Sequence, residues 1–501
     1  MKGLLIADGV RTAAARTPGK VAVTDGARQL TFGRLAERID CVSNLAHAGF
    51  GLPKSARAAI LAPNCLEYLE LVCGLSSAGL AVATIGPAAP AAEIRFICED
   101  SAAEILFVDP ILEEMARAAI PGSVRHVVPL GPAYEALLAR SSAARCPVEV
   151  VESDIFSVPY TSGSTGRPKG VMLSHRGRVL SAFCMAAEHG CYSADDRAIA
   201  TTPMFHGAGF LMAITPILFG GAVRILRRFD VEQLLAAIVE FGATSAYIVP
   251  THFAAMLAMG SRARRFDLSR LKAVISGTAP LAQAMKAEIV GLIGEGRLYE
   301  RYGTTETSIA TCLRPADQLR KAACVGLPLP LTRTRIVAAD GGDVAPGEVG
   351  ELAVCSPYMF SGYLNMPEAT AAAFRGEWFV TGDLARTDEE GYLYLVDRKD
   401  DMIISGGENV YPREIEEVLL GHPGVAECAV AGLAHAYWGE AVTAFVVPKP
   451  GAAPDAGEMA EFCRARLSGY KVPKEFRFVD ALPRNSMGKV LRRALRDGSS
   501  G

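Results

Sequence analysis

Short apolar runs rich in β-forming residues alternate with stretches of helical periodicity along the first two-thirds of this chain. RAAILAP (57–63) and AVATIG (81–86) are predicted strands, and CLEYLELVCGLSSAGL (65–80) between them has apolar residues at helical spacing. Further predicted strands lie at 103–109, 125–131, 244–250 and 271–281. Strands separated by helices tend to pair in parallel beneath those helices. The alternation therefore predicts an α/β fold with mostly parallel sheets.

The pattern changes further along the chain. From about Arg335 the predicted strands are shorter and are separated by glycine turns, which indicates a small β-rich subdomain. After Asp397 a charged DRKDD segment precedes a new βα pattern, with a helix predicted at 412–420 and a surface loop at 448–458. A chain of 501 residues exceeds what one hydrophobic core sustains. We expect an N-terminal domain over 1–397, a hinge at 398–401 and a C-terminal domain over 402–497.

Composition narrows the classes of function. The net charge of −3 and the pI near 6.3 create no field that would favour nucleic acid or an anionic membrane as a partner. The longest apolar run, 210–223, is short and interrupted, so we expect no integral membrane segment. The 12 cysteines contain no CxxC pair, which indicates reduced thiols rather than disulfides or zinc. The first twenty residues lack a secretory pattern, and we expect a cytoplasmic protein.

The segment YTSGSTGRPKG (160–170) concentrates small donors beside a single positive charge. Backbone N–H groups of a Gly/Ser/Thr turn can cradle phosphate oxygens, and Lys169 would add a point charge. The Walker spacing GxxxxGK[ST] and the dinucleotide spacing GxGxxG are both absent. These letters alone are compatible with another kind of phosphate loop and with a plain turn.

The longer string YTSGSTGRPKGVMLSH (160–175) resembles the signature of the adenylate-forming superfamily, which contains acyl- and aryl-CoA synthetases, adenylation domains and luciferases. The other motifs of that superfamily follow in order: RYGTTE (301–306), TGD (381–383), DRKDDMIISGGENVYPREIE (397–416) and PRNSMGK (483–489). The resemblance covers nearly the whole chain. Three segments look most like bacterial 4-chlorobenzoate-type aryl-CoA ligases: the motif at 397–416, YWGEAVTAFVVP (437–448) and PTHFAAMLA (250–258).

The resemblance implies a large N-terminal domain of α/β sheets packed with helices, a small β-rich subdomain, and a small mobile C-terminal α+β domain. It implies ATP, Mg²⁺ and coenzyme A as cofactors, and a carboxylic acid as the substrate. The acid would react with ATP to give acyl-AMP and pyrophosphate, and then with CoA to give acyl-CoA and AMP.

Four residues are expected to be catalytic by this resemblance. Lys489 would bridge the carboxylate and the α-phosphate, where a preorganised charge commonly contributes about 10²–10³ in rate. Glu306, together with Thr165, would hold Mg²⁺, which prefers one or two carboxylates plus phosphate oxygens. Thr305 would donate to phosphate, and His206 would lie at the carboxylate end of the acid pocket. Without the motifs, Lys489 could be a solvated lysine, Glu306 an acid near a helix start and His206 a core residue.

The nucleotide and CoA sites are expected from the same comparison. The predicted ATP-binding residues are Thr161, Ser162, Gly163, Ser164, Thr165, Gly166, Lys169, Gly277, Thr278, Ala279, Tyr302, Gly303, Thr304, and, at the ribose, Asp383 and Arg398. The C-terminal domain would rotate about Asp400 between the two half-reactions. Gly406 and Gly407 would then line the thiol tunnel, or form a plain turn before the helix at 412. Predicted CoA contacts are Trp438, Tyr470 and Lys474, although Val472 replaces a basic residue of the aryl ligases.

The predicted acid pocket consists of His206, Gly207, Tyr247, Ala279 and Ile309, which suits an aromatic or medium-chain acid. Arg301 admits another interpretation, because ERYG also occurs in malonyl-CoA synthetases, where arginines bind a second carboxylate; a surface or phosphate-side arginine is the alternative.

Other functions share these motifs. The chain could load a phosphopantetheinyl carrier protein, act as a non-catalytic nucleotide-binding regulator, or import fatty acids at a membrane. The intact Lys489, Glu306 and Asp383 favour an enzyme, and we expect a monomer or homodimer.

Overall fold

The strands predicted in the first part of the chain form two sheets in the computed structural model, which describes residues 3–162, 167–484 and 490–498. The chain divides into two compact units. The first contains residues 1–322, 326–334 and 354–379, and the second contains residues 323–325, 335–353 and 380–501. Each unit is described separately below.

The larger sheet of the first unit has nine strands in the order β16-β15-β14-β13-β12-β10-β11-β1-β2. The six strands from β14 to β1 are parallel to their neighbours, as the βα alternation predicted, and antiparallel strands close both edges. The strands are β1 Val21–Thr24, β2 Gln29–Thr31, β10 Arg197–Ala200, β11 Ala222–Ile225, β12 Ser245–Tyr247, β13 Ala273–Ser276, β14 Leu298–Tyr302, β15 Thr311–Leu313 and β16 Leu327–Pro328.

The second sheet of this unit has seven strands, with β6-β5-β3-β4-β7-β8 in order and β9 paired to β7. Its strands are β3 Arg57–Leu61, β4 Ala81–Ile85, β5 Ile105–Val108, β6 His126–Pro129, β7 Ile155–Ser162, β8 Pro168–Gly170 and β9 Leu173–Ser174. The predicted strands at 57–63, 81–86, 103–109 and 125–131 are therefore confirmed, each slightly shorter than expected.

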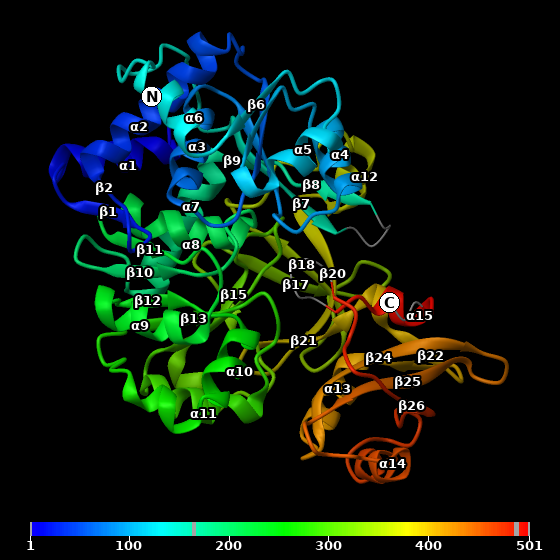
Figure 1. Ribbon diagram of the computed structural model, residues 1–501. Helices are drawn as coiled ribbons and strands as arrows, with labels where there is room; N and C mark the ends of the chain where they lie inside the picture. Colours follow the sequence, from blue (N-terminus) through cyan, green and yellow to red (C-terminus); the bar gives the residue numbers. More distant parts are fainter. Residues whose placement is uncertain (1–2, 163–166, 485–489, 499–501) are drawn as a thin grey trace. The chain divides into compact units, whose positions relative to one another are not determined.

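Helices cover these sheets (Figure 1). They are α1 Ile6–Arg16, α2 Phe32–Asn44, α3 Leu66–Ser77, α4 Ala91–Asp100, α5 Glu113–Ala119, α6 Pro132–Ala139, α7 His175–His189, α8 Gly207–Leu218, α9 Val231–Phe241, α10 Pro250–Ala258, α11 Gln283–Ile293 and α12 Pro367–Ala372. None of the helices in the described part of the chain combines the length and apolarity needed to cross a bilayer.

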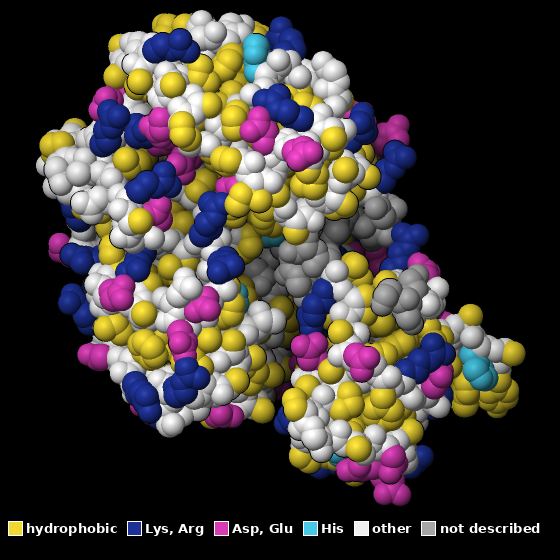
Figure 2. Space-filling view, in the orientation of Figure 1, with side chains coloured by type: hydrophobic (Ala, Val, Ile, Leu, Met, Phe, Trp, Pro, Cys, Tyr) yellow, Lys and Arg dark blue, Asp and Glu magenta, His cyan; other side chains and the backbone are white. Residues whose placement is uncertain are grey.

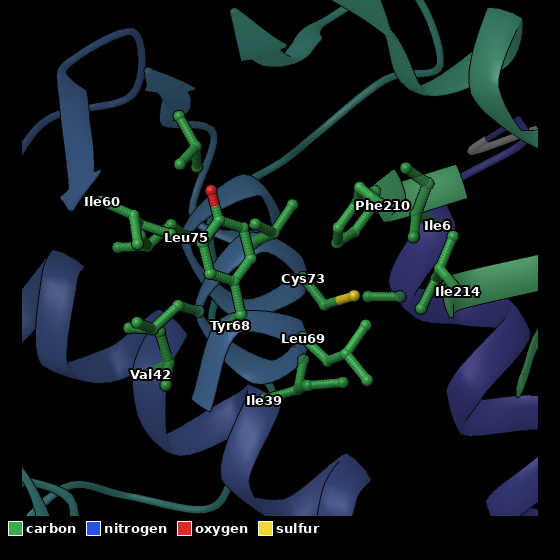
Figure 3. Packing of buried hydrophobic residues seen from close by; sticks show 14 of the residues in the cluster. Ile6, Ile39, Val42, Ile60, Tyr68, Leu69, Cys73, Leu75, Phe210 and Ile214 are labelled. Atoms are coloured by element: carbon green, nitrogen blue, oxygen red, sulfur yellow. The ribbon is translucent and has the colours of Figure 1, made fainter. Parts of the chain in front are cut away.

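The main core of the first unit surrounds α3, which is buried on nearly every side. Figure 3 shows Tyr68, Leu69, Cys73 and Leu75 packed among residues of α1, α2, α8 and β3. A helix that is apolar all round needs such an interior position. Fully buried apolar side chains each contribute about 1.5–3 kcal/mol of transfer free energy, so α3 anchors this unit.

A third sheet follows, with the strand order β17-β18-β20-β19 and with β21 paired to β20. Its strands are β17 Arg333–Val337, β18 Gly350–Cys355, β19 Phe374–Arg375, β20 Trp378–Thr387 and β21 Leu393–Arg398. These strands confirm the β-rich segment predicted from about Arg335.

The C-terminal part of the second unit is a five-stranded sheet with helices. Its strands are β22 Ile403–Ser405, β23 Glu408–Val410, β24 Val425–His435, β25 Gly439–Pro448 and β26 Glu475–Phe478, and its helices are α13 Pro412–Leu420, α14 Ala456–Arg464 and α15 Arg492–Arg496. The helix predicted at 412–420 is confirmed: Ile415 and Leu419 pack with Val430 and Val442.

Two local predictions in this region are wrong. The predicted surface loop at 448–458 ends earlier, because Asp455 caps α14 by accepting a hydrogen bond from the backbone N–H of Glu458 at 2.9 Å. Gly406 and Gly407 connect two strands rather than a strand and a helix, because the short strand β23 lies between them and α13.

Candidate active site

Two paired strands flank the segment rich in Gly, Ser and Thr. Strands β7 and β8 pair antiparallel, with Tyr160 opposite Gly170, Thr161 opposite Lys169 and Ser162 opposite Pro168. The predicted phosphate residues Gly163, Ser164, Thr165 and Gly166 lie outside the described residues. The hairpin of β7 and β8 therefore makes Thr161 and Lys169 cross-strand partners.

Tyr363 connects this hairpin to Glu306. The Lys169 ammonium lies 5.1 Å from the centre of the Tyr363 ring, and the Tyr363 hydroxyl donates to Glu306 Oε1 at 2.9 Å. The backbone supports the arrangement, because Leu364 donates to the Gly170 carbonyl and Phe360 to the Glu306 carbonyl, both at 2.8 Å. Sequence reasoning missed Tyr363. Its partners are distant in the chain, and no local spacing indicates the contact.

The loop after β14 is a closed turn. The Thr304 N–H donates to Thr307 Oγ1 at 2.9 Å, and the Thr307 N–H donates to Thr304 Oγ1 at 3.2 Å. A Cβ on Gly303 would lie 2.1 Å from the Ser308 carbonyl oxygen, so this position accommodates only glycine. The closed turn leaves Thr305 and Glu306 half-buried at its tip, next to Tyr302 at the end of β14.

The predicted nucleotide and acid residues cluster because neighbouring parallel strands end at one edge of the sheet. Tyr247 ends β12, Gly277 follows β13, Tyr302 ends β14, and His206 follows β10. The strand order β14-β13-β12-β10 makes these ends adjacent. The crevice beyond the carboxyl ends of such strands is where α/β sheets commonly bind ligands.

The loop 277–279 is tightly packed at its first residue and exposed afterwards. A Cβ on Gly277 would lie 3.0 Å from the Tyr247 hydroxyl and 3.1 Å from Arg301 Cγ, whereas Thr278 and Ala279 are exposed. The buried carboxylate of Glu300 supports this loop: it accepts from the Leu281 N–H at 3.2 Å and pairs with Lys286 at 2.7 Å.

The acid end of the site lies at the start of α8. A Cβ on Gly207 would lie 3.3 Å from Arg178 Nη2 and 3.8 Å from Thr305 Cγ2, so the predicted acid and phosphate residues are in contact distance. Burial lowers the pKa of His206 to about 4, and the imidazole is therefore neutral at pH 7. A small cavity beside His206 is also lined by Arg178.

Two of the remaining pocket residues belong to one apolar cluster. Tyr247 and Ile309 are buried there with Met212 and Ile275, while Ala279 lies outside the cluster on the exposed loop. Sequence reasoning missed Arg178, which is buried on α7. The segment SHRGRV does not indicate which of its arginines faces the interior.

In the second unit the two predicted ribose residues are cross-strand partners. Asp383 on β20 pairs in register with Arg398 on β21, and Arg398 Nε donates to Asp383 Oδ1 at 2.8 Å. The Asp383 N–H donates to Thr381 Oγ1 at 3.1 Å, which holds the TGD turn. The carboxylate is thus oriented by a cation before any ligand binds.

The predicted hinge is tied to the last described helix. The Asp400 carbonyl accepts from Arg496 at 3.4 Å, and the half-buried Arg492 donates to Asp401 at 3.0 Å and to Glu416 at 2.8 Å. Lys489 lies outside the described residues, and α15 begins three positions after it.

Three of the predicted CoA residues lie together. The Gly406 N–H donates to the Trp438 carbonyl at 2.9 Å, and the Lys474 ammonium lies 5.0 Å from the centre of the Trp438 ring. Gly406 and Gly407 both have positive φ, as the β22–β23 turn requires. Tyr470 has a different neighbour: the Lys471 ammonium lies 5.6 Å from the centre of its ring. Val472 is a buried core residue, which explains an apolar side chain there.

Comparison with known proteins gives one consistent family. The family model for AMP-binding enzymes matches residues 10–364, and that for the AMP-binding enzyme C-terminal domain matches residues 414–489. The chain is 36% identical over 483 residues to a feruloyl-CoA synthase from Amycolatopsis sp., covering 96% of both chains. It is 37% identical to a 2-succinylbenzoate–CoA ligase from Geobacillus kaustophilus, covering 96% of this chain and 95% of that protein.

Solved structures agree with this assignment. The ATP-bound crystal structure of MatB from Rhodopseudomonas palustris superposes with a TM-score of 0.91 at 32% identity, and 98% of each chain is covered. The predicted α/β fold with a large N-terminal and a small C-terminal part is therefore confirmed. Particular closeness to 4-chlorobenzoate-type ligases stays a prediction.

Proposed function

This chain belongs to the family of AMP-binding enzymes, and we propose that it is an ATP-dependent carboxylic acid:CoA ligase. In the first half-reaction a carboxylate oxygen attacks the α-phosphorus, and the bond to the β-phosphate oxygen breaks with release of pyrophosphate. In the second, the CoA sulfur attacks the acyl carbon, the bond to the AMP oxygen breaks, and the thiol proton is lost to solvent.

The proposal depends most on the meeting of acid and phosphate residues at Thr305. This side chain lies beside Gly207 of the acid pocket and precedes Glu306, which Tyr363 links to Lys169 of the phosphate hairpin. Adenylation needs the carboxylate and the α-phosphate within bonding reach despite their like charges. At about 4 Å and an effective dielectric near 20, unit charges repel by roughly 4 kcal/mol, so cations are needed here.

The roles of individual residues remain proposals. Lys169 would neutralise phosphate charge, and Glu306 would hold Mg²⁺ together with phosphate oxygens and water. Within the described ranges no three His, Cys, Asp or Glu side chains gather as a metal cage, so the nucleotide would supply the other ligands. Asp383 and Arg398 would bind the ribose hydroxyls, and Lys489 would bridge the reacting groups.

For the second half-reaction we propose rotation about Asp400, with domains at 1–397 and 402–497. The grouping of Gly406, Trp438 and Lys474 supports CoA as the thiol acceptor: an aromatic face beside a cation suits the pantetheine arm and its phosphates. We further propose a cytoplasmic enzyme acting as a monomer or homodimer.

Acid-dependent pyrophosphate release tests the function directly. Purified protein with ATP and Mg²⁺ is assayed against aromatic, medium-chain and dicarboxylic acids, with and without CoA. We expect at least one acid to support pyrophosphate release and CoA-dependent AMP formation in equal amounts. If ATP is never cleaved in an acid-dependent way, the proposed function is wrong.

A further inference from the structure

Two buried arginines in the first unit have no acidic partner in the part of the chain that the structure describes. Arg178 on α7 is 5% exposed and Arg301 on β14 is 8% exposed. The Nε of each is buried without a hydrogen-bond partner, and neither forms an ion pair within residues 3–162, 167–484 and 490–498. By contrast, Arg38 is 7% exposed and is bonded to Glu70 at 2.5 Å and Glu135 at 2.7 Å. A buried guanidinium normally requires such compensation.

On the surface, too, arginines are commonly paired. Charges of both signs intermingle on the face of the first unit seen in Figure 2, and pairs such as Arg176–Glu152 at 2.6 Å recur along the chain. Arg178 and Arg301 are therefore unusual in being both buried and unpaired.

Aromatic rings hold the two guanidinium groups in place. Arg178 Cζ lies 5.7 Å from the centre of the Phe156 ring, and Arg301 Cζ lies 4.7 Å from the centre of the Tyr247 ring. A ring contacts the flat face of a guanidinium and leaves its N–H edge free for bidentate bonds to an anion. Burial lowers the pKa of Arg178 to about 9, and the positive charge of Arg301 contributes to the shift. The two cations therefore act on each other.

Their positions mark two ends of the acid site. Arg178 lies at Gly207 and beside the cavity next to His206, close to Thr305. Arg301 lies next to Gly277, which follows β13, and over the ring of Tyr247, which ends β12. We infer that the substrate is a small dicarboxylic acid, with its reacting carboxylate at Arg178 and its second carboxylate at Arg301.

This inference rests on the proposed function. It follows from which of the two carboxylates keeps its negative charge during the reaction. In adenylation the reacting carboxylate oxygen bonds to phosphorus and loses its negative charge, whereas the second carboxylate keeps its charge through both half-reactions. Arg301 would therefore have a partner from substrate binding to product release. An aromatic or aliphatic monoacid would leave Arg301 buried and unpaired throughout.

The test compares acids of nearly equal shape that differ by one charge. We measure pyrophosphate release in the presence of ATP, Mg²⁺ and CoA. The diacids are malonic, succinic, glutaric and adipic acids, and each is compared with its half-amide. Benzoic and octanoic acids represent the monoacids. We expect one diacid to exceed its half-amide in kcat/KM by at least about 10²-fold, because a buried charged group left unpaired penalises the analogue. Half-amides or monoacids that match the diacids would overturn the inference and leave the ligase function intact.

Variants assign the effect to the arginines. Arg301→Met should bring the ratio of diacid to half-amide within about 3-fold of one, and Arg301→Lys should retain part of the preference. Arg178→Met should lower turnover of both acids alike. The matched control is Arg197→Met: Arg197 also lies over a ring, that of Phe241 at 5.6 Å, but it is exposed at the other end of β10. An unchanged ratio in Arg301→Met would overturn the assignment.

Melting temperatures separate specificity from misfolding. Both Met variants should melt at or above wild type, because each removes a buried charge without a partner. Millimolar concentrations of the preferred diacid should raise the melting temperature of wild type and not that of Arg301→Met. If no acid of any class supports pyrophosphate release, the proposed function fails, and the inference with it.

Discussion

Tyr363 donates a hydrogen bond to Glu306 at 2.9 Å while its ring faces the ammonium of Lys169. One side chain thus sets the positions of the proposed Mg²⁺ ligand and of the proposed phosphate cation.

Tyr363→Phe removes this hydrogen bond and keeps the ring. A bond to a charged group contributes about 1.5–3 kcal/mol, so we expect turnover to fall roughly 10- to 100-fold and the Mg²⁺ requirement to rise. Pyrophosphate release over a Mg²⁺ titration measures both. Tyr358→Phe is the control, because that hydroxyl bonds the Pro330 carbonyl at 2.8 Å instead. Equal Mg²⁺ dependence in both variants would contradict the proposed role.

Gly303→Ala should disrupt the turn that carries Thr305 and Glu306. The added Cβ would meet the Ser308 carbonyl oxygen at 2.1 Å, so the backbone must move. A displacement of about 1 Å in a catalytic group can cost about 10²-fold in rate, and we expect a loss of that order. Gly291→Ala is the matched control on α11, where nothing lies near the new Cβ. It should stabilise the protein by about 0.5–1 kcal/mol. Normal turnover in Gly303→Ala would refute the packing argument.

Lys489→Ala should separate the two half-reactions. We expect acid-dependent pyrophosphate release to fall by about 10²–10³ while CoA transfer from supplied acyl-AMP persists. Asp400→Pro is the complementary variant and should impair thioester formation more than adenylation, because proline restricts backbone rotation at the proposed hinge. Equal loss of both steps in Lys489→Ala would argue against its proposed role.

The protein should lose stability as the pH falls from about 6.5 to about 4. Burial lowers the pKa of His175, His189, His206 and His252 to about 4 each, whereas an unfolded histidine titrates near 6.5. In this window the unfolded chain binds protons that the folded chain does not, so acid favours unfolding; above it the stabilisation is fully present.

Urea unfolding at a series of pH values measures this dependence. His252 is the residue to substitute, because it lies outside the proposed site. Its ring stacks on that of Phe229, with the ring centres 3.7 Å apart. His252→Gln should reduce the slope of unfolding free energy against pH near pH 5 by roughly one proton, about 1.4 kcal/mol per pH unit. A slope identical to wild type would show that this imidazole is not buried in its neutral form.

The sequence by itself determined the secondary structure where local periodicity is strong, and the order of the functional motifs. The buried strands at 57–61 and 81–85 and the helix at 412–420 lie where the apolar spacing predicts them. These patterns are local, because period 2 or 3.6 is a property of neighbouring residues. The short strand β23 and the early start of α14 escaped prediction, because three residues and one capping aspartate carry little periodic signal.

Only the tertiary structure decided which distant residues meet and which charges are buried. Tyr363 and Glu306 are 57 residues apart, and no local pattern relates them. Arg178 and Arg301 look like ordinary charged residues in the sequence, yet packing of α7 and β14 encloses both with no acid paired to them among the described residues. Burial and pairing depend on contacts between elements, and these decide what the site can bind.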